Sequence, residues 1–421
     1  MELYKVRKFI PKKSVTLDVP ASKSILNRAI VLAAFGKGDV TISCGSFAED
    51  TRAMLGCISA LGIRWEGCEQ GLHICGCGGN IPNRRATLDV RSAGTAARFL
   101  TAALAFLGGE YEMRASEQMA RRPMELLSVL EEAGIQIEPL GEKGHFPFCL
   151  RSDGIHSEEL VINTDVSTQF ASGVLLAAAV SRPLRVRLTG SRTKGSYLLM
   201  TLRLLDAFGA SYSREGDVIR VTPSAHSPAL FEAEGDLSGA CYFYTLALLL
   251  GAQVRVRRIH ADSVQGDKKF LSLLAARGVL FSDSEEGLLA DGRNVTSFRG
   301  FEEDMRDYSD QALTVAALAP FADSPTRLTG LKHIRRQECD RVHAIAHNLS
   351  ALGVPVREEE DGVVITPAPV RGGTIETFGD HRVAMAFSLI GLKTGNIAIE
   401  NPSCCQKTFD NFFQLLDELT S

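Results

Sequence analysis

The sequence predicts an α/β protein of two domains, each containing three repeated units of about 70 residues. Its 421 residues exceed what one hydrophobic core organises, since single cores stop growing near about 250–300 residues. Two kinds of helical segment recur six times along the chain, and extended apolar segments follow them. Six such units fill the chain, so three in each domain agree with the length.

The composition is that of a globular protein without a strong charge. Apolar residues make up 45% of the chain, and 46 Lys and Arg against 50 Asp and Glu give a net charge of −4. This balance argues against a nucleic-acid partner, although a few well-placed cations could bind a small anion. The N-terminus lacks the apolar segment of a signal peptide, and the longest apolar stretch, Tyr242–Val254, falls short of the ~20 residues that span a membrane. We therefore expect a cytoplasmic protein without a membrane partner.

Ten cysteines are spread along the chain, and none forms a Cys-x-x-Cys motif. Cys68, Cys75 and Cys77 lie closest together, with His73 between them, but a fourth ligand at a zinc-like spacing is missing. Reduced cytoplasmic thiols without a metal are the favoured interpretation. A metal site at this cluster stays open as the alternative.

The first repeated feature is a leucine-rich helical segment that ends in a glycine and precedes an extended apolar segment. The glycines lie 69 to 75 residues apart. A glycine just past a helix supplies the left-handed conformation that ends it, and the apolar residue after it opens a strand. The segments are Met54–Gly62, Leu126–Gly134, Thr201–Gly209, Phe270–Gly278, Ile345–Gly353 and, without its glycine, Phe412–Leu419.

A second helix is predicted between these segments, again six times. The six helices are apolar nearly all round and rich in Ala, Gly and Ser, which is typical of helices buried inside a domain. Their first turns lie 70 to 73 residues apart, at Ser24, Thr95, Thr168, Ser238, Asp310 and His381. Strands are expected after them, for example at Asp39–Ser43, Leu184–Leu188 and Asn396–Glu400.

Polar residues concentrate in the first turns of these buried helices. The first N–H groups of a helix lack partners, and Ser or Thr can cap them. Capping does not explain Lys23, Arg28 or Arg382, because a cation near a helix N-terminus opposes the macrodipole. An anion bound there by N–H groups and charged side chains would explain them. The sequence therefore predicts that several helix N-termini meet at a cleft for a ligand with several negative groups.

The same residues carry a resemblance to a known family. Lys23–Arg28 and Cys404–Phe409 resemble motifs of the 5-enolpyruvylshikimate-3-phosphate synthases, a branch of the enolpyruvyl transferase family. The resemblance covers essentially the whole chain, and its motifs occur in order at family-like spacing. The intermediate matches are Ala93–Ala96 with Arg98, Arg122–Met124, Ser167–Phe170, Glu234–Asp236, Gln265–Asp267, Glu338–Arg341 and Asp380–Arg382.

The resemblance implies a two-domain inside-out α/β barrel with threefold pseudosymmetry in each half. One domain would comprise residues 21–233 and the other residues 1–20 with 234–421, so that the chain crosses between them twice. The six-unit repeat found above agrees with this layout. The resemblance also suggests a monomer.

The implied reaction transfers the enolpyruvyl group of phosphoenolpyruvate to the 5-hydroxyl of shikimate 3-phosphate and releases phosphate. It proceeds by addition and elimination through a tetrahedral intermediate, in the shikimate pathway of aromatic amino acid biosynthesis. A base must accept the hydroxyl proton, and an acid must protonate the methylene carbon. Cations must hold phosphate and carboxylate groups. Neither a metal nor an organic cofactor is implied, and the family is the target of glyphosate.

Roles carry over only to positions that match the family motifs. Asp310 matches the base for the 5-hydroxyl, Glu338 the proton donor or relay, and Lys23 a residue that contacts both substrates. The matches to shikimate 3-phosphate binding are Lys23, Ser24, Arg28, Ser167, Thr168, Gln169, Tyr197, Asp310 and Gln337. The matches to phosphoenolpyruvate binding are Lys23, Gly94, Thr95, Arg122, Gln169, Arg341, Arg382 and Lys407. The alternative for Glu338 and Arg341 is a surface ion pair three residues apart.

Several positions depart from the family pattern. Gln337 replaces the usual lysine, so it can still form hydrogen bonds but brings no charge. Ser92 replaces an asparagine, and Phe99 replaces a proline on the helix that shapes the glyphosate pocket, so we expect altered glyphosate sensitivity. Lys194–Tyr197 replaces Ser-Lys/Arg-Pro-Tyr, and only Tyr197 carries over.

Two other functions stay open. A sister enzyme transfers enolpyruvate to UDP-N-acetylglucosamine, but it typically has Lys-Asn in place of Lys23-Ser24 and a reactive loop cysteine. No cysteine lies between Cys77 and Cys149. The other is a non-catalytic binding homologue, suggested by Gln337. The presence of the matched base, acid and cations favours the enzyme.

Overall fold

The computed structural model describes residues 2–9, 14–69 and 71–421, and the chain divides into two compact units. Unit 1 combines Met1–Pro20 with Gly235–Ser421, and unit 2 is Ala21–Glu234. The chain therefore passes between the units twice. In the described part of the chain, no helix combines the length and apolar character needed to cross a membrane.

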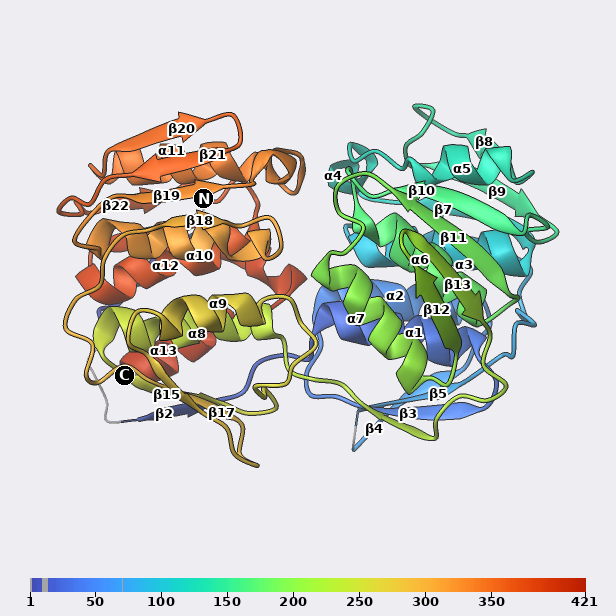
Figure 1. Cartoon of the computed structure of the whole chain (residues 1–421), viewed down its shortest axis with the longest axis horizontal. Coiled ribbons are helices and arrows are strands. Elements are labelled where there is room, and N and C mark those ends of the chain that lie inside the picture. Colours follow the sequence, from blue (N-terminus) through green and yellow to red (C-terminus); the bar gives the residue numbers. More distant parts are fainter. Residues whose placement is uncertain (1, 10–13, 70) are drawn as a thin grey trace. The chain divides into compact units, whose positions relative to one another are not determined.

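Three helices buried along almost their whole length form the centre of each unit (Figure 1). In unit 2 they are α1 (Lys23–Phe35), α3 (Gly94–Leu107) and α6 (Thr168–Ala179). In unit 1 they are α8 (Leu237–Leu250), α10 (Ala312–Leu318) and α12 (His381–Thr394). The predicted buried helices are confirmed, except that Asp310 lies in the 3-10 turn η1 (Ser309–Gln311) just before α10. A second 3-10 turn, η2 (Ala319–Phe321), follows α10.

The outer helices are those that the glycine pattern predicted. They are α2 (Glu49–Ala60), α5 (Leu126–Glu132), α7 (Ser196–Ala207), α9 (Lys268–Ala275), α11 (Arg341–Ala351) and α13 (Phe412–Thr420). The five predicted terminating glycines all have positive φ, between 76° and 94°, as a left-handed helix end requires. One short helix, α4 (Glu117–Ala120), lies outside the repeat.

Small sheets complete the units, and each begins with a parallel strand pair. In unit 2 the sheet orders are β14 (Leu230–Glu232), β3 (Asp39–Ser43), β5 (Gly71–Cys75), β4 (Trp65–Cys68); then β6 (Arg85–Asp89), β7 (Gly109–Arg114), β9 (Phe148–Ser152), β8 (Gln136–Pro139); then β10 (Glu159–Asn163), β11 (Leu184–Thr189), β13 (Val218–Thr222), β12 (Ser211–Glu215). An inner helix forms the crossover between parallel strands, as between β6 and β7.

Unit 1 repeats this plan with strands from both ends of the chain. Its sheet orders are β2 (Val15–Leu17), β15 (Gln253–Val256), β17 (Leu288–Asp291), β16 (Leu280–Ser282); then β18 (Glu302–Asp304), β19 (Thr326–Thr329), β21 (Gly362–Ile365), β20 (Val356–Glu359); then β22 (Gly373–Ile375), β23 (Ile397–Glu400), β1 (Leu3–Val6). In both units the three buried helices lie inside and the sheets outside, which confirms the predicted inside-out α/β architecture (Figure 1).

Candidate active site

The inner helices of unit 2 begin close together. Asn27 Nδ2 donates to Thr95 Oγ1 at 2.6 Å and joins α1 to the first turn of α3. Arg28 Nη2 donates to Ser172 Oγ at 3.2 Å and joins α1 to α6. The sequence prediction that these N-termini converge is therefore confirmed within this unit.

Two of these helices begin without a side-chain cap. Neither Ser22 before α1 nor Ala93 before α3 accepts a hydrogen bond from the first turn through its side chain. By contrast, Ser167 Oγ accepts from Gln169 N at 3.2 Å and caps α6, whose first residue, Thr168, is buried. The first turns of α1 and α3 thus offer N–H groups that an anion can accept.

The start of α3 lies beside two of the predicted binding residues. A Cβ built at Gly94 would lie 3.3 Å from Arg122 Nη1 and 3.5 Å from Gln169 Oε1. It would also lie 2.8 Å from Arg98 Nη1, so a side chain at position 94 would displace the groups around it. Gln169 Oε1 is buried and has no hydrogen-bond partner among the described residues. A buried acceptor of this kind is satisfied when a ligand donates to it.

Lys23 pairs with a carboxylate that the sequence analysis missed. Its Nζ lies 3.1 Å from Asp50 Oδ2, and the exposed fractions of the two side chains are 22% and 4%. Asp50 therefore compensates the positive charge that the sequence analysis attributed to a ligand anion. An acidic residue in the first turn of α2 is favourable for the helix dipole alone, so its position gave no sign of this partner.

Arg28 is fully buried and its hydrogen bonds go to neutral oxygens. Nε donates to Thr201 Oγ1 at 2.8 Å, and Nη1 donates to the Ser24 carbonyl at 2.6 Å. Nη2 donates to the Tyr197 carbonyl at 3.3 Å, and the guanidinium lies over the buried Phe99 ring, 5.0 Å from its centre. Burial lowers the pKa of Arg28 to about 10. These contacts tie α1 to α7 and orient Ser24 and Tyr197.

In unit 1, the predicted catalytic carboxylates surround Arg341, the first residue of α11. Nε donates to Asp380 Oδ2 at 2.7 Å, Nη1 to Asp310 Oδ1 at 3.0 Å. Nη2 donates to Glu338 Oε2 at 2.9 Å, and Gln337 Oε1 also accepts from Nη1. Burial alone would lower the pKa of Arg341, but the nearby carboxylates raise it overall.

Two further cations complete this network. Arg382 Nη2 lies 2.9 Å from Asp310 Oδ2, and Lys407 Nζ lies 3.1 Å from Glu338 Oε1. Arg382 is the second residue of α12, and Lys407 ends the 3-10 segment η4 (Pro402–Lys407). Because Arg382 and Asp310 compensate each other, no ligand is needed to explain this cation either.

The alternative of a surface ion pair between Glu338 and Arg341 is excluded. The two side chains do pair at 2.9 Å, but only 11% and 1% of them are exposed. A short 3-10 segment, η3 (Lys332–Arg336), leads into Glu338. All five N–H donors of Arg341 have acceptors, if the longer contact of 3.4 Å to Asp380 Oδ1 is included. Arg341 therefore orients carboxylates, which leaves Arg382 and Lys407 as the more accessible cations.

A second missed carboxylate, Asp267, lies behind Asp310. It is buried and accepts hydrogen bonds from Ser238 Oγ at 3.0 Å and from Gln311 Nε2 at 2.8 Å. These bonds join the start of α8 to η1. Burial raises the pKa of Asp267 to about 6, and the charge of Asp310 contributes to the rise. The Gln265–Asp267 motif was noted in the sequence, but its spacing does not indicate a role.

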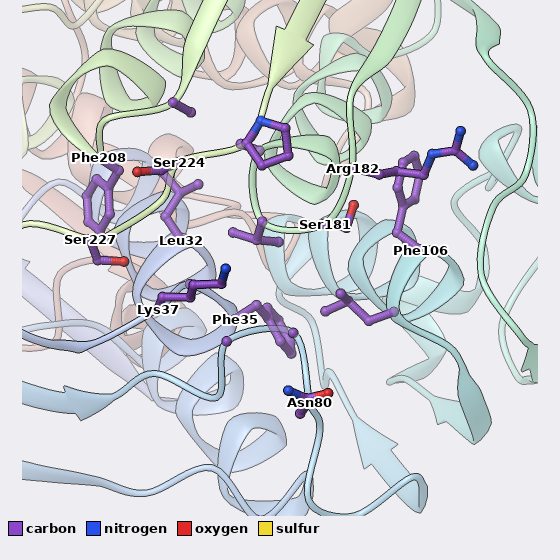
Figure 2. Close-up of a pocket in the computed structure, with 18 residues that line it drawn as sticks. Leu32, Phe35, Lys37, Asn80, Phe106, Ser181, Arg182, Phe208, Ser224 and Ser227 are labelled. Carbon is purple, nitrogen blue, oxygen red and sulfur yellow. The ribbon is translucent and has the colours of Figure 1, made fainter.

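A cavity of about 400 Å³ in unit 2 lies at the other end of the inner helices. Its lining includes Phe35, which ends α1, and Val180, which follows α6 (Figure 2). No predicted site residue lines it. Helix C-termini carry partial negative charge, while Lys37 and Arg182 also line this cavity.

The sequence profile of the EPSP synthase family (3-phosphoshikimate 1-carboxyvinyltransferase) matches residues 11–416. The chain belongs to this family. A relative named 3-phosphoshikimate 1-carboxyvinyltransferase, from Trichormus variabilis, is 35% identical over 404 residues, which are 94% of each protein. The family resemblance inferred from the motifs is therefore confirmed, and the chain is a transferase by family.

Two solved structures have the same fold as this chain. An EPSP synthase from Acinetobacter baumannii matches with a TM-score of 0.79 and 24% identity, over 100% of this chain and 98% of its own. The enolpyruvyl transferase NikO from Streptomyces tendae matches with a TM-score of 0.74 and 18% identity, over 99% and 97%. At these identities the likeness concerns the fold, and it agrees with the EPSP synthase family assignment.

Proposed function

We propose that this chain transfers the enolpyruvyl group of phosphoenolpyruvate to the 5-hydroxyl of shikimate 3-phosphate and releases phosphate. Family membership and the name of the relative support this activity. The observation that carries it is the buried network in which Arg341 orients Asp310 and Glu338 next to Arg382 and Lys407. Two oriented carboxylates with adjacent cations are what an addition and elimination on an anionic substrate requires.

In the proposed addition, Asp310 accepts the proton of the 5-hydroxyl, while the hydroxyl oxygen attacks C2 of phosphoenolpyruvate. Glu338 takes a proton from solvent before this step and delivers it to the methylene carbon C3. A tetrahedral carbon forms that carries a methyl group, the carboxylate, the phosphate and the new ether. In the elimination, Glu338 takes a proton back from the methyl group and the double bond reforms. The C–O bond to phosphate breaks, and the phosphate leaves with the bonding electron pair and accepts the proton held by Asp310. The products are the enolpyruvyl ether and phosphate.

Binding of the anionic groups is assigned to the accessible cations and the uncapped helices. The first turns of α1 and α3, with Lys23, Ser24 and Thr168, hold the phosphate and hydroxyls of shikimate 3-phosphate. The family motifs assign phosphoenolpyruvate binding to Arg122, Arg382 and Lys407. Arg28 acts as a positioning residue, since its hydrogen bonds go to the protein. The buried acceptor Gln169 Oε1 supports a substrate hydroxyl at this position.

We further propose that the enzyme acts as a monomer in the cytoplasm and needs no cofactor. The family resemblance is the ground for the monomer. Size-exclusion chromatography with light scattering tests it. The altered glyphosate sensitivity expected from Phe99 stays a prediction.

A phosphate-release assay with both substrates tests the reaction. The parent chain should release phosphate, and Asp310→Asn should reduce the rate by about 100-fold or more, because general base catalysis contributes that much. The matched control is Asp307→Asn, whose carboxylate is three residues away, is half-exposed and pairs with Lys269. Its rate should stay near that of the parent.

The same assay separates the alternatives. Binding of shikimate 3-phosphate without phosphate release in the parent would support the non-catalytic homologue and overturn the proposal. Phosphate release with UDP-N-acetylglucosamine but not with shikimate 3-phosphate would support the sister reaction. Equal loss in Asp307→Asn and Asp310→Asn would remove the special role of Asp310.

A further inference from the structure

One outward face of the β3–β5 strand pair brings three metal-ligating side chains together. Asp39 begins β3 and lies directly opposite Cys75, which ends β5. His73 lies two residues before Cys75 and therefore on the same face, while the alternate residue Ile74 is buried in the core. One ligand atom each from Asp39, His73 and Cys75 lies within 4.8 Å of the other two.

A hydrogen bond orients the imidazole of His73. Its Nδ1 lies 3.2 Å from Thr41 Oγ1, the residue opposite it on β3. This bond leaves Nε2 on the side of the Asp39 carboxylate, 4.0 Å from Oδ2. Metal-binding histidines commonly have one ring nitrogen held in this way, which fixes the ring orientation and the tautomer.

The charge pattern of this sheet differs from that of the next sheet in the unit. On β7 and β9, Glu110 pairs with Arg151 at 2.9 Å across the strands. On the β3–β5–β4 face, Glu66 lies opposite His73 on its other side. Within the described residues, no lysine or arginine forms an ion pair with Asp39 or Glu66. A bound cation would supply the positive charge that arginine supplies on the neighbouring sheet.

We propose that Asp39, His73 and Cys75 form a binding site for a zinc ion or a similarly soft divalent cation. A fourth ligand comes from Glu66 or from water. Tetrahedral zinc with one sulfur ligand needs ligand atoms about 3.3–3.6 Å apart, so the observed separations require shifts of about 1 Å by half-exposed side chains. Cys75 loses its proton to solvent on binding, and the thiolate and carboxylate together neutralise the divalent ion.

The donor set selects the metal. A thiolate and an imidazole favour zinc over magnesium, which prefers oxygen ligands in octahedral geometry. The sequence spacing grouped Cys75 with Cys68 and Cys77, and the favoured prediction was that these thiols bind no metal. The structure instead adds Asp39, whose pairing with Cys75 spans 36 residues of sequence and depends on the strand register. None of these residues takes part in the proposed enolpyruvyl transfer.

Zinc titration of the reduced, untagged full-length chain tests the site, with a chromophoric chelator as competitor. One equivalent of zinc should bind, and magnesium in excess should not displace it. Cobalt(II) should give a sulfur-to-metal charge-transfer band and the visible bands of a tetrahedral complex. Cys75→Ser should abolish the charge-transfer band, and both Cys75→Ser and His73→Gln should weaken zinc binding by about tenfold or more.

The matched control is Cys68→Ser, which removes an exposed thiol from the neighbouring strand β4. It should bind zinc and cobalt as the parent does. Zinc should also raise the melting temperature of the parent and of Cys68→Ser, but not that of Cys75→Ser. The proposal is overturned if the parent forms no one-to-one complex, or if Cys75→Ser and the parent bind zinc equally.

Discussion

Lys23 and Arg382 both lie in the first turn of a buried helix, where the macrodipole opposes positive charge. Each has a carboxylate partner, Asp50 at 3.1 Å and Asp310 at 2.9 Å. Removing one partner of a buried ion pair leaves an uncompensated charge and costs more than losing a surface pair. Substitutions of these carboxylates therefore affect stability as well as activity, and isosteric changes such as Asp→Asn separate the two effects best.

Asp267 provides a prediction about pH. Burial raises its pKa to about 6 from its ordinary value of 3.8, so the folded protein binds this proton more tightly than the unfolded chain does. The contribution of Asp267 to stability is therefore full at low pH and is lost as the pH rises from about 4 to about 6. This loss amounts to about 2 kcal/mol between pH 4 and pH 7.

The variant Asp267→Asn should lack this loss. Between pH 4 and pH 7, the free energy of unfolding of the variant should rise by about 2 kcal/mol relative to that of the parent. The variant therefore becomes more stable than the parent as the pH rises. Denaturant unfolding at a series of pH values measures the difference. The control is Asp262→Asn, at an exposed carboxylate near Asp267, and it should follow the parent. Parallel curves for Asp267→Asn and the parent would show that Asp267 ionises normally in the folded state.

The sequence could indicate the site residues but not their partners. The family resemblance pointed to Asp310, Glu338 and Arg382, and the structure places them in one network. Asp380 was noted only within a motif, yet it accepts from Arg341 at 2.7 Å and also caps α12. A contact of this kind depends on tertiary packing across tens of residues, whereas capping preference is local.

At the scale of the element, the pattern of terminating glycines was the most informative signal. A left-handed helix end is a local requirement, so it can be read from sequence, and all five glycines have the expected conformation. Short strands were harder to predict. β14 and β22 have three residues each, which are too few positions to show the alternation of apolar and polar residues. The pairing of β2 with β15 joins segments more than 230 residues apart and has no local signal.

Gly134 offers a test of the helix ends. It has a φ of 94°, and a Cβ built there meets nothing within 4 Å, so Gly134→Ala costs only the strain of the left-handed backbone. We expect a loss of about 1 kcal/mol in the free energy of unfolding. The matched control is Gly56→Ala in the interior of α2, which also meets nothing within 4 Å and should be neutral or stabilising by up to about 1 kcal/mol. Equal effects of the two changes would mean that the helix-end conformation is not what selects glycine.

At the scale of the whole molecule, the N-terminal strands β1 and β2 belong to unit 1, whereas the segment that follows them in sequence forms unit 2. Val15 and Leu17 on β2 are buried and pair with β15 in unit 1, although unit 2 follows them directly in sequence. Unit 1 therefore needs both ends of the chain to complete its core. Unit 2 is one continuous segment and closes its own first sheet with β14, which pairs with β3.

Leu17→Ala tests this division, because the side chain belongs to the hydrophobic core of unit 1. The change should destabilise the protein by about 2–4 kcal/mol, as large-to-small changes at buried leucines do. Hydrogen exchange followed by mass spectrometry should show faster opening at the amides of β15 and α8, with little change in α1, α3 and α6. Thr16→Ala, at the exposed position next to Leu17, should leave both groups of amides unchanged. Faster exchange of equal size in both units would show that the two cores open as one, since only a shared opening transmits a loss in one core to every amide.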